Sequence, residues 1–158
     1  MPDNNPLLGE APLPRFDAIL PEHVEPALRE TLALNRIRLA EIAALAEPSF
    51  ATVVVPLEEM RHRLGCVWSP VAHLNGVLSS DALRAAYNRC LPLLSEYYTD
   101  LAQSELLYQA YLRIREREGA VLDAEQRAVL ERALRDFRLA GVALDPARKA
   151  RFKTLMVE

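Results

Sequence analysis

The chain has 158 residues, of which 51% are hydrophobic and 26% charged, and its formal net charge is −3. This length fits one domain with a substantial core, and the composition excludes a disordered chain. The small negative charge gives nucleic acid no overall attraction, and two cysteines are too few for a disulfide-stapled secreted fold. Without a signal-peptide pattern, or an apolar run near the ~20 residues of a membrane helix, we expect a cytoplasmic protein.

Prolines are frequent in the first 20 residues, at positions 2, 6, 12 and 14. Because proline fixes φ and biases the preceding residue away from helix, residues 1–20 are predicted to form an extended arm. Five apolar side chains could pin the arm to a core: Leu7, Leu8, Leu13, Phe16 and Ile19. A disordered tail is the alternative. Residues 21–158 are predicted to form one helical domain.

The first helix is predicted over residues 21–46. Six residues there alternate gaps of four and three, which is the spacing of one helical face: Leu28, Leu32, Asn35, Leu39, Ile42 and Ala46. Asn35 falls on the same face and would need a hydrogen-bond partner there. Pro48 ends this helix, and Ser49 is a candidate N-cap for the next.

The second helix is predicted to begin near Phe50, to bend at Pro56 and to end at Trp68. The run Val53–Val55 resembles a strand locally, since branching at Cβ stiffens χ1. No other segment alternates with a period of two, so a lone strand would have no partner. We therefore predict helix for this run.

Two further helices follow in the middle of the chain. Ser79 or Ser80 is the predicted N-cap of a helix that carries Pro92 in its interior, where proline should kink it. Helical spacing then predicts a helix over residues 104–118, and Gly119 closes it.

The last two helices have the clearest start signals. Asp123 with Gln126 three residues later resembles a capping box, and Gly141 is a candidate C-cap. Pro146 opens a final helix that shows no stop signal, so we interpret that helix as cut at residue 158. The predicted fold class is all-α: an irregular bundle of about five to seven helices, some kinked by proline, with an extended proline-rich N-terminal arm.

Three candidate metal ligands surround the unusual stretch GCVWSPVAHLNGVL. His62, Cys66 and His73 are spaced four and seven residues apart, on one helical face, and imidazole and thiolate suit zinc or copper. However, the two histidines would lie roughly 16 Å apart along the axis, too far for one ion unless Pro70 folds the chain back. No fourth ligand is evident.

The same stretch has a structural interpretation, which we favour. Proline removes one helical hydrogen bond, and short polar side chains in the next turn could bond the freed carbonyls. This interpretation predicts a buried, hydrogen-bonded kink without catalytic, cofactor-binding or metal residues, formed by Ser69, Pro70, His73, Leu74 and Asn75.

Other candidates for chemistry are also weak. Cys66 and Cys90 lie among apolar neighbours in predicted helices, so we expect inert core thiols. The pairs Glu58–Glu59 and Asp123–Glu125 are expected to face solvent or helix dipoles. Five scattered glycines form no phosphate loop. Residues 113–153 hold 11 Lys/Arg against 7 Asp/Glu, but the interleaved signs are typical of a solvated face.

Long phrases of the chain resemble the thimet-oligopeptidase family of zinc metallopeptidases, in order and over nearly the whole chain. They are NPLL at 5–8, LPRFDAILPEHVEPAL at 13–28, WSPVAHLNGV at 68–77, LRAAYNRCLPLLSEY at 83–97, LYQAY at 107–111 and ALRDFRLAGVAL at 133–144. His62 and Cys66 fall outside these phrases, which weakens the metal interpretation further.

The resemblance implies a part of an enzyme rather than a complete one. The family holds zinc with two histidines of a His-Glu-x-x-His motif and a later glutamate, and the glutamate of the motif activates water. The three histidines of this chain, His23, His62 and His73, are not followed by glutamate. The resemblance therefore implies the N-terminal helical portion, which forms one wall of a channel that admits short peptides.

The implied parent is a cytoplasmic zinc metalloendopeptidase, and the implied partners are its missing catalytic portion and short peptides. Zinc would belong to the parent, and this portion alone would be inactive. No nucleic acid or membrane partner is expected. Two alternatives stay open: a stand-alone helical interaction module without enzymatic activity, and an RNA-binding bundle.

Overall fold

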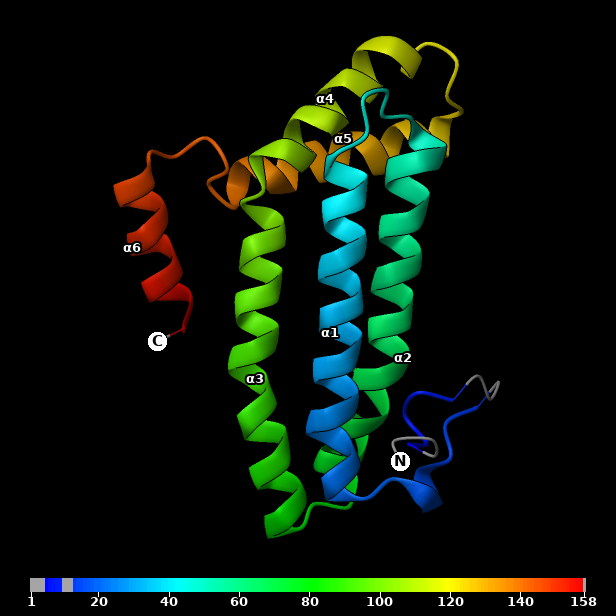
Figure 1. Ribbon diagram of the computed structural model, residues 1–158, viewed down its shortest axis with the longest axis vertical. Helices are drawn as coiled ribbons and strands as arrows, with labels where there is room; N and C mark the ends of the chain where they lie inside the picture. Colours follow the sequence, from blue (N-terminus) through cyan, green and yellow to red (C-terminus); the bar gives the residue numbers. More distant parts are fainter. Residues whose placement is uncertain (1–4, 10–12, 158) are drawn as a thin grey trace. The chain divides into compact units, whose positions relative to one another are not determined.

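The computed structural model describes residues 5–9 and 13–157, without the side chains of residues 146, 153 and 155–157 (Figure 1). In this part of the chain the fold is all-α, as predicted, with no strand. The six α-helices are α1 Pro21–Ala43, α2 Val55–Val77, α3 Asp81–Ala102, α4 Glu105–Glu118, α5 Ala124–Leu139 and α6 Pro146–Val157. A 3₁₀ turn, η1 Phe16–Ala18, precedes α1, and a π-helical turn, η2 Phe50–Val54, leads into α2.

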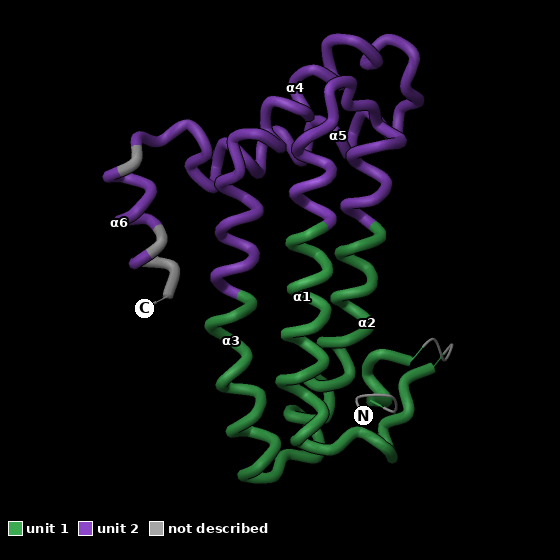
Figure 2. Tube along the Cα trace, in the orientation of Figure 1, with its two compact units in different colours: residues 1–37, 59–94 green, residues 38–58, 95–158 purple. Residues whose placement is uncertain are grey.

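The chain divides into two compact units (Figure 2). Unit 1 comprises Met1–Ile37 and Glu59–Leu94, and unit 2 comprises Arg38–Glu58 and Ser95–Glu158. The helices α1, α2 and α3 each contribute a segment to both units. The prediction of an arm over residues 1–20 and one helical domain over residues 21–158 stays a prediction.

Unit 1 packs segments of α1, α2 and α3 around an aliphatic core. Trp68 of α2 stacks on Tyr87 of α3 with ring centroids 4.8 Å apart. Arg89 of α3 pairs with Glu25 of α1, with Nε 3.0 Å from Oε2. The core side chains are nearly inaccessible and lie at helical spacing: Val24, Ala27, Leu28, Leu32, Leu64, Val67, Val71, Ala86 and Cys90.

Pro70 lies inside α2, which continues to Val77. The prediction that this helix ends at Trp68 is therefore wrong. Proline has no N–H to donate to the carbonyl of Cys66, but this removes only one hydrogen bond of the helix. Buried apolar residues on both sides of Pro70, including Val67 and Val71, hold the two halves of α2 in the core of unit 1.

Unit 2 contains a helical hairpin, in which the antiparallel helices α4 and α5 are connected by a short loop. Its core is formed by side chains at helical spacing on both helices: Leu107, Ala110, Ile114, Leu130 and Leu134. The ring of Tyr111 on α4 meets Phe137 of α5 edge-on, with centroids 5.3 Å apart. The backbone N–H of Phe50 donates to Glu118 Oε2 at 2.9 Å, which ties the start of η2 to the end of α4.

Helices of unit 2 begin close to the residues that the sequence predicts, and nearby side chains cap those starts. The Asp123 carboxylate accepts from the N–H of Gln126, whose side chain accepts from the N–H of Asp123, which completes a capping box. Ser104 caps α4. Ser49 caps η2 with a reciprocal bond from Thr52, and the strand-like valines that follow are helical, as predicted.

Nearby residues also set the end of α5 and the start of α6. Gly141 has φ +79°, and the N–H groups of Gly141 and Val142 donate to the carbonyls of Arg138 and Phe137, which is a Schellman motif. Asp145 accepts from the N–H of Arg148 at 2.9 Å, where α6 begins. The predicted cut at residue 158 lies outside the described residues. Nowhere in the described chain is a helix long and apolar enough to cross a membrane.

Candidate functional site

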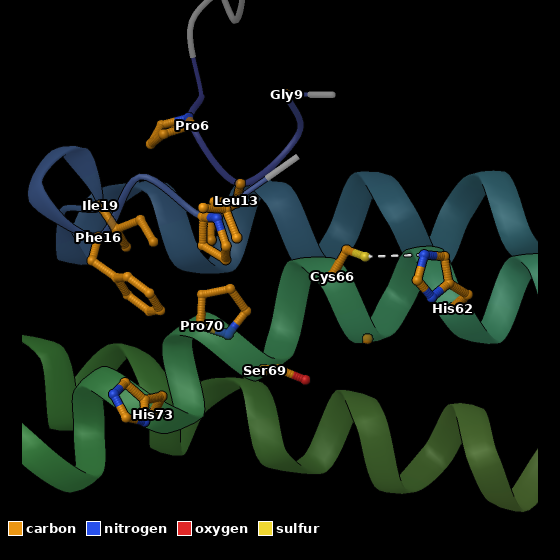
Figure 3. A pocket seen from close by; sticks show the side chains of 13 residues that line it. Pro6, Gly9, Leu13, Phe16, Ile19, His62, Cys66, Ser69, Pro70 and His73 are labelled. Atoms are coloured by element: carbon orange, nitrogen blue, oxygen red, sulfur yellow. Dashed lines mark hydrogen bonds between the residues drawn. The ribbon is translucent and has the colours of Figure 1, made fainter. Parts of the chain in front are cut away.

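A groove of about 530 Å³ in unit 1, here called the arm groove, lies between the N-terminal segment and α2 (Figure 3). The N-terminal segment contributes Pro6, Leu7, Gly9, Leu13, Pro14, Phe16 and Ile19, and α2 contributes His62, Gly65, Cys66, Ser69, Pro70 and His73. The lining is mostly apolar. None of these thirteen described residues is an aspartate, glutamate, lysine or arginine.

One hydrogen bond to α1, one within the segment and a buried leucine hold the N-terminal segment in place. Asn5 Nδ2 donates to the carbonyl of His23 at 2.8 Å, and Asn5 Oδ1 accepts from the N–H of Leu7 at 3.1 Å. Leu7 is 5% exposed and pins the segment, as predicted. Leu13 and Phe16 are 76% and 42% exposed, so the prediction that they pin it is wrong. They line the groove instead.

The α2 side of the groove carries four polar or reactive side chains on one face. His62, Cys66, Ser69 and His73 follow one another at gaps of four, three and four residues, and all are exposed. Cys66 Sγ lies 3.6 Å from His62 Nε2. Farther along α2, the ring of His73 lies against that of Phe16, with centroids 5.5 Å apart (Figure 3).

The three candidate metal ligands therefore make two separate contacts. Cys66 and His62 form a pair, while His73 contacts an aromatic ring. Within the described residues no group of three His, Cys, Asp or Glu side chains could hold a metal ion. The arm groove itself was not predicted, since its two sides are some 50 residues apart and no sequence pattern relates them.

The five residues of the predicted kink are not all buried, contrary to the sequence interpretation. Pro70 and Leu74 are buried, whereas Ser69 and His73 are exposed, so a buried role for His73 is wrong. The Asn75 side-chain oxygen accepts from Ser79 Oγ at 3.4 Å. A kink at this segment stays a prediction.

The two cysteines have opposite environments. Cys90 is fully buried, and burial raises the pKa of its thiol, with the nearby Glu25 carboxylate adding to the effect. Cys66 is exposed, so the prediction of a core thiol is confirmed for Cys90 and wrong for Cys66. Hydrogen bonds from Arg29 and Arg89 lower the pKa of Glu25.

The remaining charged candidates are at the surface, as predicted. Glu58 and Glu59 are exposed, and Asp123 serves as an N-cap. Basic residues of the region 113–153 pair with acids at exposed positions: Arg115 with Glu131, Arg117 with Glu47, Arg132 with Asp136 and Arg148 with Asp145. These pairs fit a solvated face with interleaved charge.

Comparison with known proteins identifies the family. Residues 28–149 match the family model of the neurolysin/thimet oligopeptidase N-terminal domain. The chain belongs to this family. Oligopeptidase A of Salmonella typhimurium and that of Escherichia coli are 43% and 42% identical over 94% of the chain. The probable cytosolic oligopeptidase A of Arabidopsis thaliana is 32% identical over 98%. These findings confirm the resemblance.

The chain spans about 22% of the length of these oligopeptidase A relatives. Within this oligopeptidase N-terminal domain, the α2 side of the arm groove lies inside the matched residues 28–149, and the N-terminal side lies before them.

Proposed function

We propose that this chain is the N-terminal, channel-wall portion of a zinc-dependent oligopeptidase that hydrolyses short peptides in the cytoplasm. The observation that carries this proposal is the family match over residues 28–149, together with relatives that are named oligopeptidase A and of which the chain spans 22%. Their name supports a peptidase as the parent protein.

The catalytic machinery of that parent would lie in the rest of the protein. The chain holds no His-Glu-x-x-His motif, and its three histidines are dispersed at positions 23, 62 and 73. The His62–Cys66 pair offers two ligands, and no third joins them among the described residues, so this donor set does not fit a catalytic zinc site. We therefore assign no catalytic step to this chain.

The contribution of the chain to peptide hydrolysis would be mechanical and steric. Fully buried aliphatic layers on α1, α2 and α3 in unit 1, and on α4 and α5 in unit 2, give each unit a fixed surface. A fixed surface beside a reaction centre limits which peptides can enter, without contact between the surface and the scissile bond. The partners are then the catalytic portion of the parent and the short peptides themselves.

A peptidase assay of the purified chain tests the proposal. Internally quenched peptides of five to ten residues would be incubated with the chain, with and without added zinc, and the fluorescence followed. We expect no cleavage under either condition. A cleavage rate that elutes with the chain through two different columns, and that a metal chelator abolishes, would contradict the proposal.

A further inference from the structure

The arm groove places a cysteine, a histidine and an apolar surface together. Cys66 Sγ and His62 Nε2 are 3.6 Å apart on adjacent turns of α2, and both side chains line the groove (Figure 3). Neither residue has a part in the proposed peptidase function, and the inference below goes beyond that function.

We propose that Cys66 is a covalent modification site, at which a small neutral disulfide exchanges with the thiol while its apolar body lies in the arm groove. The inference rests on three features of the described residues: an accessible thiol, an imidazole in contact with it, and an uncharged apolar surface beside it.

Accessibility selects Cys66 over the second thiol of the chain. Cys66 is exposed, whereas Cys90 is 0% exposed in the core of unit 1. Burial also raises the pKa of Cys90, so less of its thiol is ionised at neutral pH. Since the thiolate is the nucleophile in disulfide exchange, Cys90 serves as an internal control.

The contact with His62 provides a place for the thiol proton. When the imidazole carries its own proton on Nδ1, Nε2 is free to accept the proton of the Cys66 thiol. A nucleophile in contact with a base is the arrangement by which proteins activate cysteines. His23 of α1 lies outside the pair and is not one of the thirteen lining residues, and so it is the matched histidine.

The lining of the arm groove indicates the class of reagent. None of the thirteen described lining residues is charged, so these residues offer no ion-pair partner to a charged molecule such as glutathione disulfide. Exposed apolar side chains such as Leu13 and Phe16 would instead gain from burial against an aromatic or aliphatic body.

The exchange reaction balances without a further reagent. His62 takes the proton of Cys66, and the thiolate attacks one sulfur of the disulfide R–S–S–R. The new Cys66–S–R bond forms as the old S–S bond breaks, and the leaving thiolate takes the proton from His62 to become R–SH. Cys66 is oxidised, and the departing half of the disulfide is reduced.

The test follows the reaction of the chain with dipyridyl disulfide, a neutral reagent whose released pyridinethione absorbs light. Mass spectrometry of proteolytic fragments then locates the adduct. We expect modification at Cys66 and not at Cys90, at a rate about tenfold above that of a peptide with the sequence of residues 62–70. Glutathione disulfide should show no such advantage over the peptide.

Three variants make the test specific. His62→Gln should lower the rate about tenfold, and the matched His23→Gln should leave it within about twofold. Leu13→Ser should lower the rate for the neutral disulfide alone, since this exposed side chain lines the groove without supporting the core. Circular dichroism verifies that all three variants keep their helices.

Two results would overturn the proposal. One is a rate at Cys66 no higher than that of the peptide. The other is an equal effect of His62→Gln and His23→Gln, which would show that contact with Cys66 gives no advantage.

Discussion

The α4–α5 hairpin and the arm groove are specified by the sequence in different ways. In the hairpin, nearby residues set each helix end, as with Asp123 and Gln126 in the capping box and Gly141 at the end of α5. In the groove, the two sides come from residues 6–19 and 62–73. The two sides meet through contacts such as that between the rings of Phe16 and His73.

This difference separates the roles of the two regions. The hairpin has a buried core that includes Leu107, Ile114 and Leu134, although Leu106 and Leu139 are exposed. It follows local rules at its helix ends, which is how a rigid structural element is specified. The groove leaves apolar side chains and a thiol accessible to solvent, which adds little to stability and leaves them available for binding. Local signals in the sequence reveal the first kind of region and miss the second.

The largest expected effect comes from removing packing in the hairpin. Leu134 of α5 is 0% exposed, so Leu134→Ala should lower the free energy of unfolding by about 2–5 kcal/mol through lost burial and a new cavity. Leu13, which is 76% exposed in the groove, is the matched control. Leu13→Ala should change the free energy of unfolding by less than about 0.5 kcal/mol. Urea unfolding measures both. Equal losses would remove the distinction between the two regions.

Substituting alanine for either of two glycines should change the stability by an intermediate amount, with opposite signs at the two positions. At Gly141, φ is +79° and an added Cβ would lie 2.5 Å from Leu144 Cδ1, so Gly141→Ala should destabilise by about 1–3 kcal/mol. At Gly65, inside α2 beside the groove, an added Cβ meets nothing within 4 Å, so Gly65→Ala should stabilise by about 0.5–1 kcal/mol. Thermal unfolding of the two variants compares them. A loss at Gly65 would mean that the groove side of α2 is tightly packed.

The smallest expected effect is a pH dependence from the α1–α3 contact of unit 1. Hydrogen bonds from Arg29 and Arg89 lower the pKa of Glu25 from 4.5, so this carboxylate stabilises the fold above that pH. The stabilisation is lost as pH falls through the lowered pKa. Glu25→Gln should therefore be less stable than the parent at neutral pH, and the two should converge in acid. A difference in urea midpoint that is constant with pH would contradict this reasoning.

The sequence predicts the elements whose signals are local. Ser49 and Asp123 cap the helical segments that they were expected to cap, because a capping side chain bonds to a backbone only two or three residues away. Helical spacing likewise identifies Leu130, Leu134 and Phe137 as core residues of α5.

The errors arise where distant segments decide the outcome. The sequence predicts that this helix ends at Trp68, yet tertiary packing of Val67 and Val71 carries it through Pro70. Apolar neighbours in the sequence suggest a buried Cys66, but neighbours along a helix lie on different faces. The N-terminal segment lies against one face of α2 because of contacts between residues some 50 positions apart. No periodic pattern in the sequence predicts such contacts.

The measurement that tests the central claim most directly is the sequence of the source gene beyond the codon for Glu158. If the chain is the N-terminal portion of an oligopeptidase, the reading frame continues and encodes a His-Glu-x-x-His motif followed by a glutamate ligand. A stop codon directly after Glu158 would contradict the proposed function, and it would favour a helical module that acts through a separate partner protein.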